Sequence, residues 1–139
     1  MRVVLDTSII VSGMLTPQGT AGQVIQYWID GEFTLLISPA ILDELTDVLD
    51  RTWMKNRLAA LPDRIPEFLA AVTGLAEMIT GYANVQGYVR DPFDEMFLAC
   101  ARLGHADVIV SLDKDLLSLG TFETTIILRL AEFLQQLQL

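Results

Sequence analysis

Hydrophobic residues in this chain follow two patterns, short unbroken runs and longer stretches in which they recur every three or four positions. Unbroken runs are typical of strands that are covered on both faces of a parallel sheet. They predict four strands, at residues 3–5, 33–37, 108–110 and 125–128.

Helical spacing dominates the segments between these runs. It predicts helices at residues 20–29, 53–61, 65–79 and 129–137. Two more helices are expected to begin at Ser38-Pro39 and at Asp91-Pro92, where an N-cap residue precedes a proline that needs no N–H partner. Alternating strands and helices predict an α/β fold with a central parallel sheet flanked by helices. Residues 1–139 contain no linker or repeat and are expected to form a single domain.

The composition indicates the cellular compartment in which the protein is expected to fold and work. Hydrophobic residues make up 52% of the chain, enough for a core without disulfides. Cys100 is the lone cysteine, which favours a reducing compartment. The apolar run after Met1 is too short for a signal peptide, and no stretch approaches a membrane span. A cytoplasmic protein without a membrane segment is therefore expected.

The net charge of −9 argues against a protein that binds nucleic acid mainly through Lys and Arg. If the substrate is nucleic acid, metal ions must supply much of the positive charge. Arg51, Lys55 and Arg57 are grouped, and we interpret them as a solvated helix end, with a contact to a substrate backbone as the alternative.

Two aspartates stand directly after predicted strands. Asp6 follows residues 3–5, and Asp113 follows residues 108–112. In open α/β sheets the functional site lies beyond the carboxyl ends of the strands, so both acids are expected at one edge. Either one alone could equally be a loop acid or a helix cap.

The helix that begins at Pro39 carries three acids, and helical geometry separates them. Asp43 and Asp47 fall opposite the apolar face and should be solvated. Glu44 lies at the border of that face, on the ridge shared with Ile41, and is expected to turn towards the sheet.

The segment from Arg90 to Glu95 and the turn after residue 112 add further acids. Asp91 is placed as an N-cap, and Asp94 shares the side of the helix that carries Phe97. Asp115 could join from the turn, although turn acids are commonly solvated.

These placements predict a cluster of four acids: Asp6, Glu44, Asp94 and Asp113. Two carboxylates about 4 Å apart repel by roughly 4 kcal/mol at an effective dielectric of about 20. Such a cluster needs a cation or shared protons, and oxygen ligands suit Mg²⁺ or Mn²⁺. Zinc is disfavoured because Cys100 and His105 offer no ligand spacing. Metal-assisted phosphodiester hydrolysis is the chemistry that this set favours.

Four segments, in order, resemble the PIN-domain nucleases, and most closely the bacterial PIN-family toxins of VapC-like toxin–antitoxin systems. They are residues 5–13 (LDTSIIVSG), 38–45 (SPAILDEL), 90–99 (RDPFDEMFLA) and 106–117 (ADVIVSLDKDLL). The resemblance implies a PIN-like three-layer fold and an endoribonuclease that uses Mg²⁺ or Mn²⁺. It also implies an RNA substrate, a cognate antitoxin protein as inhibitor and a homodimer.

The same resemblance assigns roles to individual residues. Asp6, Glu44, Asp94 and Asp113 look like the metal-binding, catalytic quartet. Ser8 looks like the polar residue that supports the first aspartate, and Asp91 and Asp115 look like supporting acids. Leu112 departs from the pattern, since relatives often carry glycine before the last aspartate.

Two alternatives remain open from the sequence. One is a PIN-like module that binds RNA or protein but has lost its chemistry. The other is a phosphatase of the haloacid-dehalogenase type with Asp6 as nucleophile. The phosphatase pattern has a second aspartate two positions later, where this chain has Ser8.

Overall fold

One sheet of six strands runs through the molecule, in the order β3-β2-β1-β4-β6-β5. The computed structural model describes all residues, from Met1 to Leu139. The strands are β1 (Arg2–Leu5), β2 (Thr34–Ile37), β3 (Glu77–Met78), β4 (Val108–Ser111), β5 (Thr121–Phe122) and β6 (Thr125–Arg129). All neighbours pair in parallel except β5 and β6, so the α/β prediction of a central parallel sheet is confirmed for all but one edge strand.

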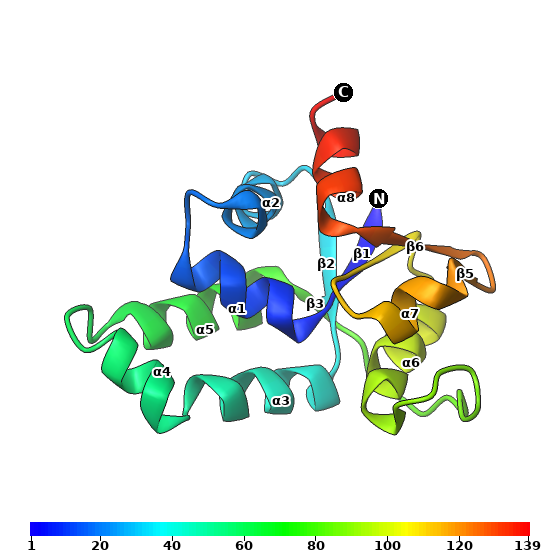
Figure 1. Cartoon of the computed structure of the whole chain (residues 1–139), viewed down its shortest axis with the longest axis horizontal. Coiled ribbons are helices and arrows are strands. Elements are labelled where there is room, and N and C mark those ends of the chain that lie inside the picture. Colours follow the sequence, from blue (N-terminus) through cyan, green and yellow to red (C-terminus); the bar gives the residue numbers. More distant parts are fainter.

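Helices cover both faces of this sheet (Figure 1). They are α1 (Thr7–Leu15), α2 (Thr20–Ile29), α3 (Pro39–Leu49), α4 (Thr52–Arg57), α5 (Arg64–Leu75), the short 3-10 helix η1 (Pro92–Asp94), α6 (Glu95–Gly104), α7 (Lys114–Leu119) and α8 (Leu130–Leu137). Helices α1, α2 and α8 pack together on one face, while α6 packs against β1 and β2 on the other. The longest of these helices, α5, has 12 residues, and none is long and apolar enough to cross a bilayer.

The core explains why the unbroken hydrophobic runs predicted strands correctly. Val3, Val4 and Leu5 of β1 are completely buried, because helices cover both faces of the central strand. Buried hydrophobic side chains from both faces form one continuous cluster. Cys100 belongs to it, and burial raises the pKa of its thiol to about 12, so the thiol stays protonated.

The predicted helix over residues 65–79 was wrong at its end. Helix α5 stops at Leu75, and Glu77–Met78 instead forms β3 beside β2. The predicted helix over residues 53–61 is also shorter, since α4 ends at Arg57. Strand β3 is fixed by pairing with β2 and by the ion pair between Arg2 and Glu77, which a local hydrophobic pattern cannot reveal.

Helices α1 and α2 approach each other closely, and this contact sets the direction of the chain just after β1. A Cβ atom at Gly22 of α2 would overlap the backbone of Pro17, and one at Gly13 of α1 would lie 2.6 Å from Cγ1 of Ile25. Glycine is therefore required here by lack of space.

We expect Gly22→Ala to lower the free energy of unfolding by about 1–3 kcal/mol, because the added methyl group overlaps backbone atoms that cannot move independently. Gly74→Ala is the matched control: it lies in α5 with no atom within 4 Å of the added Cβ, so it should raise stability by up to about 1 kcal/mol. Urea unfolding of both variants measures the two changes in stability, and equal effects would contradict the close contact between α2 and the backbone of Pro17.

Candidate metal centre

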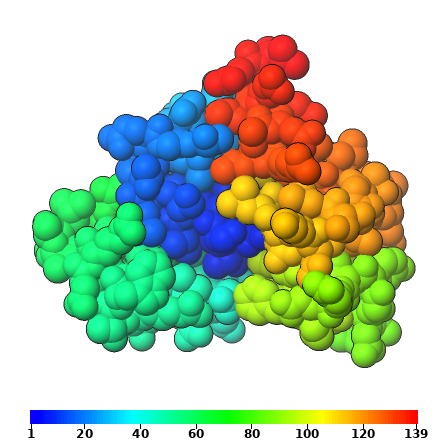
Figure 2. Space-filling view, in the orientation of Figure 1, coloured from blue at the N-terminus to red at the C-terminus, as the bar shows by residue number.

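A cleft of about 740 Å³ opens at the carboxyl ends of β1 and β4. Side chains from α1, α3, α4 and η1 line it, and the lining includes the four acids predicted to converge: Asp6, Glu44, Asp94 and Asp113. Figure 2 shows this face, where the blue surface of the first residues lies between the teal and green surface of α3–α5 and the yellow surface near α7. The fold thus brings together acids that are far apart in the sequence.

Asp6 is held rigidly at the point where β1 gives way to α1. Its side chain is only 7% exposed. The N–H of Ser8 donates a hydrogen bond to Oδ1 at 3.0 Å, which caps α1, and the hydroxyl of Ser111 donates to Oδ2 at 2.9 Å. Both carboxylate oxygens are therefore oriented by fixed donors.

Ser111 is a functional residue that sequence reasoning missed. It ends β4, is completely buried, and its hydroxyl also accepts the N–H of Asp113 at 2.9 Å. One hydroxyl thus links the aspartate after β1 to the aspartate after β4. The only signal in the sequence was a polar residue at the end of an otherwise apolar run.

Ser8 contacts Asp6 through its backbone. Its backbone N–H makes the hydrogen bond, whereas its exposed hydroxyl makes none. Leu112, the departure from the family pattern, is 54% exposed and lines the cleft beside Asp113.

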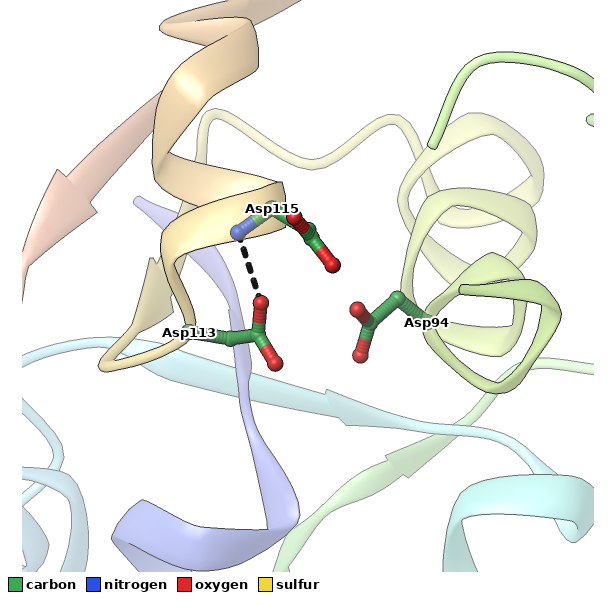
Figure 3. Close-up of side chains that lie close together, drawn as sticks. All are labelled: Asp94, Asp113 and Asp115. Carbon is green, nitrogen blue, oxygen red and sulfur yellow. Dashed lines mark hydrogen bonds between the residues drawn. The ribbon is translucent and has the colours of Figure 1, made fainter. Parts of the chain in front are cut away.

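Three carboxylates form the tightest part of the site (Figure 3). Asp94, Asp113 and Asp115 each present an oxygen, and these oxygens lie within 4.8 Å of one another. The N–H of Asp115 donates to Oδ1 of Asp113 at 2.7 Å, and Arg90 lies 3.5 Å from Asp115. The turn containing Asp115 is therefore folded into the site, as the first turn of α7.

Asp94 is the most unusual member of this cluster. It is 2% exposed, and its Oδ2 has no hydrogen-bond partner. Its pKa is raised to about 6, first of all by burial, because water no longer stabilises the charged form. Negative charges nearby also contribute to this rise, in decreasing order Asp113, Asp91, Asp6 and Asp115.

An unpartnered buried carboxylate oxygen among like charges fits a divalent cation. Carboxylates are ligands that Mg²⁺ and Mn²⁺ accept, and a cation would remove both the repulsion and the missing hydrogen bond. No histidine or cysteine stands in the cluster, so the donor set is unlike that of zinc.

Glu44 and Asp91 lie around this cluster. Glu44 is half-buried on α3 and lines the cleft, outside the group of three. Asp43 and Asp47 of the same helix are exposed, as helical geometry predicted. Asp91 is exposed and accepts the N–H of Phe93 at 3.0 Å, which confirms its predicted place as a cap.

Comparison with known proteins agrees with this geometry. The family profile described as "PIN domain" matches residues 2–115, which include all the acids described above. An uncharacterized protein of Methanocaldococcus jannaschii is 28% identical over 119 residues, which cover 86% of this chain and 75% of that protein.

The raised pKa of Asp94 predicts how stability without metal depends on pH. Its folded pKa of about 6 exceeds the usual value of 3.8, so the unfolded chain loses this proton first. We expect this residue to lower the free energy of unfolding by up to roughly 3 kcal/mol as the pH rises from about 4 to 6 and beyond. Asp94→Asn should remove that loss.

Urea unfolding in EDTA at pH 4, 5, 6 and 7 measures this effect. Asp43→Asn, on the exposed side of α3, is the control and should follow the wild type at each pH. The prediction would be wrong if Asp94→Asn were no more stable than the wild type at pH 7.

The serine pair predicts an effect on metal binding. Ser111→Ala leaves Asp6 without its hydroxyl donor and the N–H of Asp113 without an acceptor, and should weaken Mn²⁺ binding by about 10–100-fold. Ser8→Ala keeps the backbone donor and should bind Mn²⁺ like the wild type. Calorimetric titration with Mn²⁺ measures both affinities. A larger loss of Mn²⁺ affinity in Ser8→Ala than in Ser111→Ala would refute the bridging role of Ser111.

Proposed function

Because this chain belongs to the PIN-domain family, a family of metal-dependent nucleases, we propose that it is an endoribonuclease that hydrolyses RNA phosphodiester bonds with Mg²⁺ or Mn²⁺. One observation in this structure supports a metal site independently of family membership. Asp94 is buried with an unpartnered oxygen beside Asp113 and Asp115, an arrangement that a cation would stabilise.

The proposed metal ligands and catalytic residues are Asp6, Glu44, Asp94 and Asp113. Asp115 is proposed to support them from the adjoining turn, since its carboxylate lies in the same tight group. Ser8 is proposed to orient Asp6, the N-cap of α1, by donating its backbone N–H, and Asp91 is proposed to support the site by capping η1. Residues 1–139 are proposed to work as one PIN-like domain.

A bound divalent ion would polarise the phosphodiester, lower the pKa of water and stabilise the leaving oxygen. The chain's own contribution is orientation. Hydrogen bonds from Ser8 and Ser111 occupy both oxygens of Asp6, which suits a fixed ligand better than an attacking nucleophile. Without metal, the raised pKa of Asp94 lets this carboxyl hold a proton, which it must release when a cation binds.

We further propose that the protein is the toxin of a toxin–antitoxin system. The support is the motif resemblance at residues 5–13, 38–45, 90–99 and 106–117. The proposed partners are an RNA substrate, a cognate antitoxin protein and a second copy of this chain. Its place of work would be the cytoplasm, where its substrate is. Light scattering of the purified protein, alone and with its genomic neighbour, tests both protein partners.

The nuclease proposal predicts that the wild type cleaves single-stranded RNA with Mn²⁺ and that EDTA stops the reaction. Asp6→Asn and Asp94→Asn should each reduce kcat on the order of 10²- to 10³-fold, because each removes a charged ligand of the metal ion that would stabilise the transition state. Asp47→Asn, exposed on α3, should cleave at the wild-type rate. Gel analysis of labelled RNA ends measures all of these.

Two further measurements, a Mn²⁺ titration and a test for phosphorylated aspartate, separate the alternatives. Mn²⁺ binding without cleavage of any RNA would identify an inactive binding module. An acid-stable aspartyl phosphate on Asp6 would identify a phosphatase instead.

A further inference from the structure

The wall of the cleft formed by α4 and its N-cap residue differs in charge from the wall formed by the acids. Arg51 and Arg57 line the cleft together with Trp53. The chain has 9 Lys and Arg against 18 Asp and Glu, so positive charge is scarce. Neither arginine forms an ion pair or a side-chain hydrogen bond, whereas Arg2, Lys55, Arg90 and Arg102 are all paired with acids.

Trp53 is an exposed aromatic side chain in this wall. It is 51% exposed, while the other tryptophan, Trp28, is 4% exposed and belongs to the core. A half-exposed indole is not needed for the core, and exposed Trp is enriched where proteins bind other molecules. Phe93, 43% exposed, lines the same cleft next to Asp94.

Helical geometry separates these residues from their neighbour Lys55. Trp53 and Arg57 are four residues apart and share one side of α4. Lys55 lies between them in sequence, but it pairs with Asp50 at 2.8 Å and lines a different groove. The basic group seen in the sequence is therefore divided, with two arginines on the cleft and the lysine away from it.

We propose that Arg51, Trp53 and Arg57 form a nucleotide subsite next to the scissile phosphate. The indole of Trp53 stacks on an unpaired base, and the two guanidinium groups bind the backbone phosphates that flank the one held at the acids. Guanidinium groups pair with phosphate oxygens through two parallel hydrogen bonds, and aromatic rings stack on any base. This subsite rests on the proposed nuclease function.

The subsite explains how a chain of net charge −9 can hold RNA. Its two unpaired arginines lie in the cleft itself, where they offset the repulsion between the acids and the incoming phosphates. Stacking requires a base that has left its helix, so a duplex should bind poorly. The subsite thereby selects an unpaired nucleotide, of any base, for the position beside the metal centre.

Tryptophan fluorescence tests the stacking directly. Trp28 is buried, so quenching by RNA reports Trp53. The probe is a 12-nucleotide single-stranded RNA of mixed sequence, titrated into Asp6→Asn protein with Mn²⁺ so that it is not cut. We expect quenching by the single strand, and at least about tenfold weaker binding of the same RNA annealed to its complement.

Variants then separate the three side chains. In the otherwise unaltered protein, Trp53→Ala should raise KM for RNA about tenfold and leave Mn²⁺ affinity unchanged, while Trp53→Phe should retain most of the binding. Arg51→Gln and Arg57→Gln should each weaken binding and flatten the salt dependence by about 0.7 in slope. Lys55→Gln is the matched control and should match the wild type in both measurements.

The results distinguish this subsite from the nuclease function. If the wild type cleaves RNA but no RNA quenches Trp53, and Trp53→Ala has an unchanged KM, the subsite is refuted and the nuclease proposal stands. The subsite is also refuted if only a protein partner quenches Trp53. If the wild type neither binds Mn²⁺ nor cleaves, the nuclease proposal fails, while quenching by the single strand would still support RNA binding at α4.

Discussion

Repulsion among carboxylates that the fold holds close together is the constraint on which the rest of this site depends. Asp94 is buried within reach of Asp113 and Asp115, and without a cation this placement lowers stability. The hydrophobic core beneath the site, continuous across both faces of the sheet, supplies the free energy that keeps the acids in place. A ligand that binds only the folded state recovers the loss, so metal binding and folding are coupled.

The two sides of the cleft differ. The acids after β1 and β4 are held by hydrogen bonds, whereas most side chains of α4 are exposed to solvent. Ser111 ties Asp6 to the backbone of Asp113 through one buried hydroxyl, which fixes the distance between two strand ends. Trp53 and Arg57, in contrast, are exposed on a six-residue helix. The cleft therefore combines a fixed acidic wall, suited to a metal ion, with an exposed basic and aromatic wall, suited to a varied polymer.

Much of this arrangement could be predicted from the sequence, since the central strands have unbroken apolar runs and Glu44 was separated from Asp43 by helical geometry alone. Helix α1 was missed because most of its residues are buried, and its exposed polar side consists of Ser8 and Ser12 alone, too few to reveal a helical period. Strands β3 and β5 have two residues each and exist only through pairing with neighbours. The bridging role of Ser111 was hidden for the same reason, because its partners are distant in sequence.

The order of the strands along the chain determines when the site can be completed during synthesis. Strand β1 is synthesised first but lies in the middle of the sheet, where Val3 pairs with Val108 of β4. The hydrogen bond between Asp6 and Ser111 joins residues 105 positions apart. A growing chain on the ribosome cannot assemble the acid cluster until Asp113 and Asp115 have emerged. For a protein proposed to cut RNA, the metal centre would therefore form only after both halves of the sheet have been synthesised.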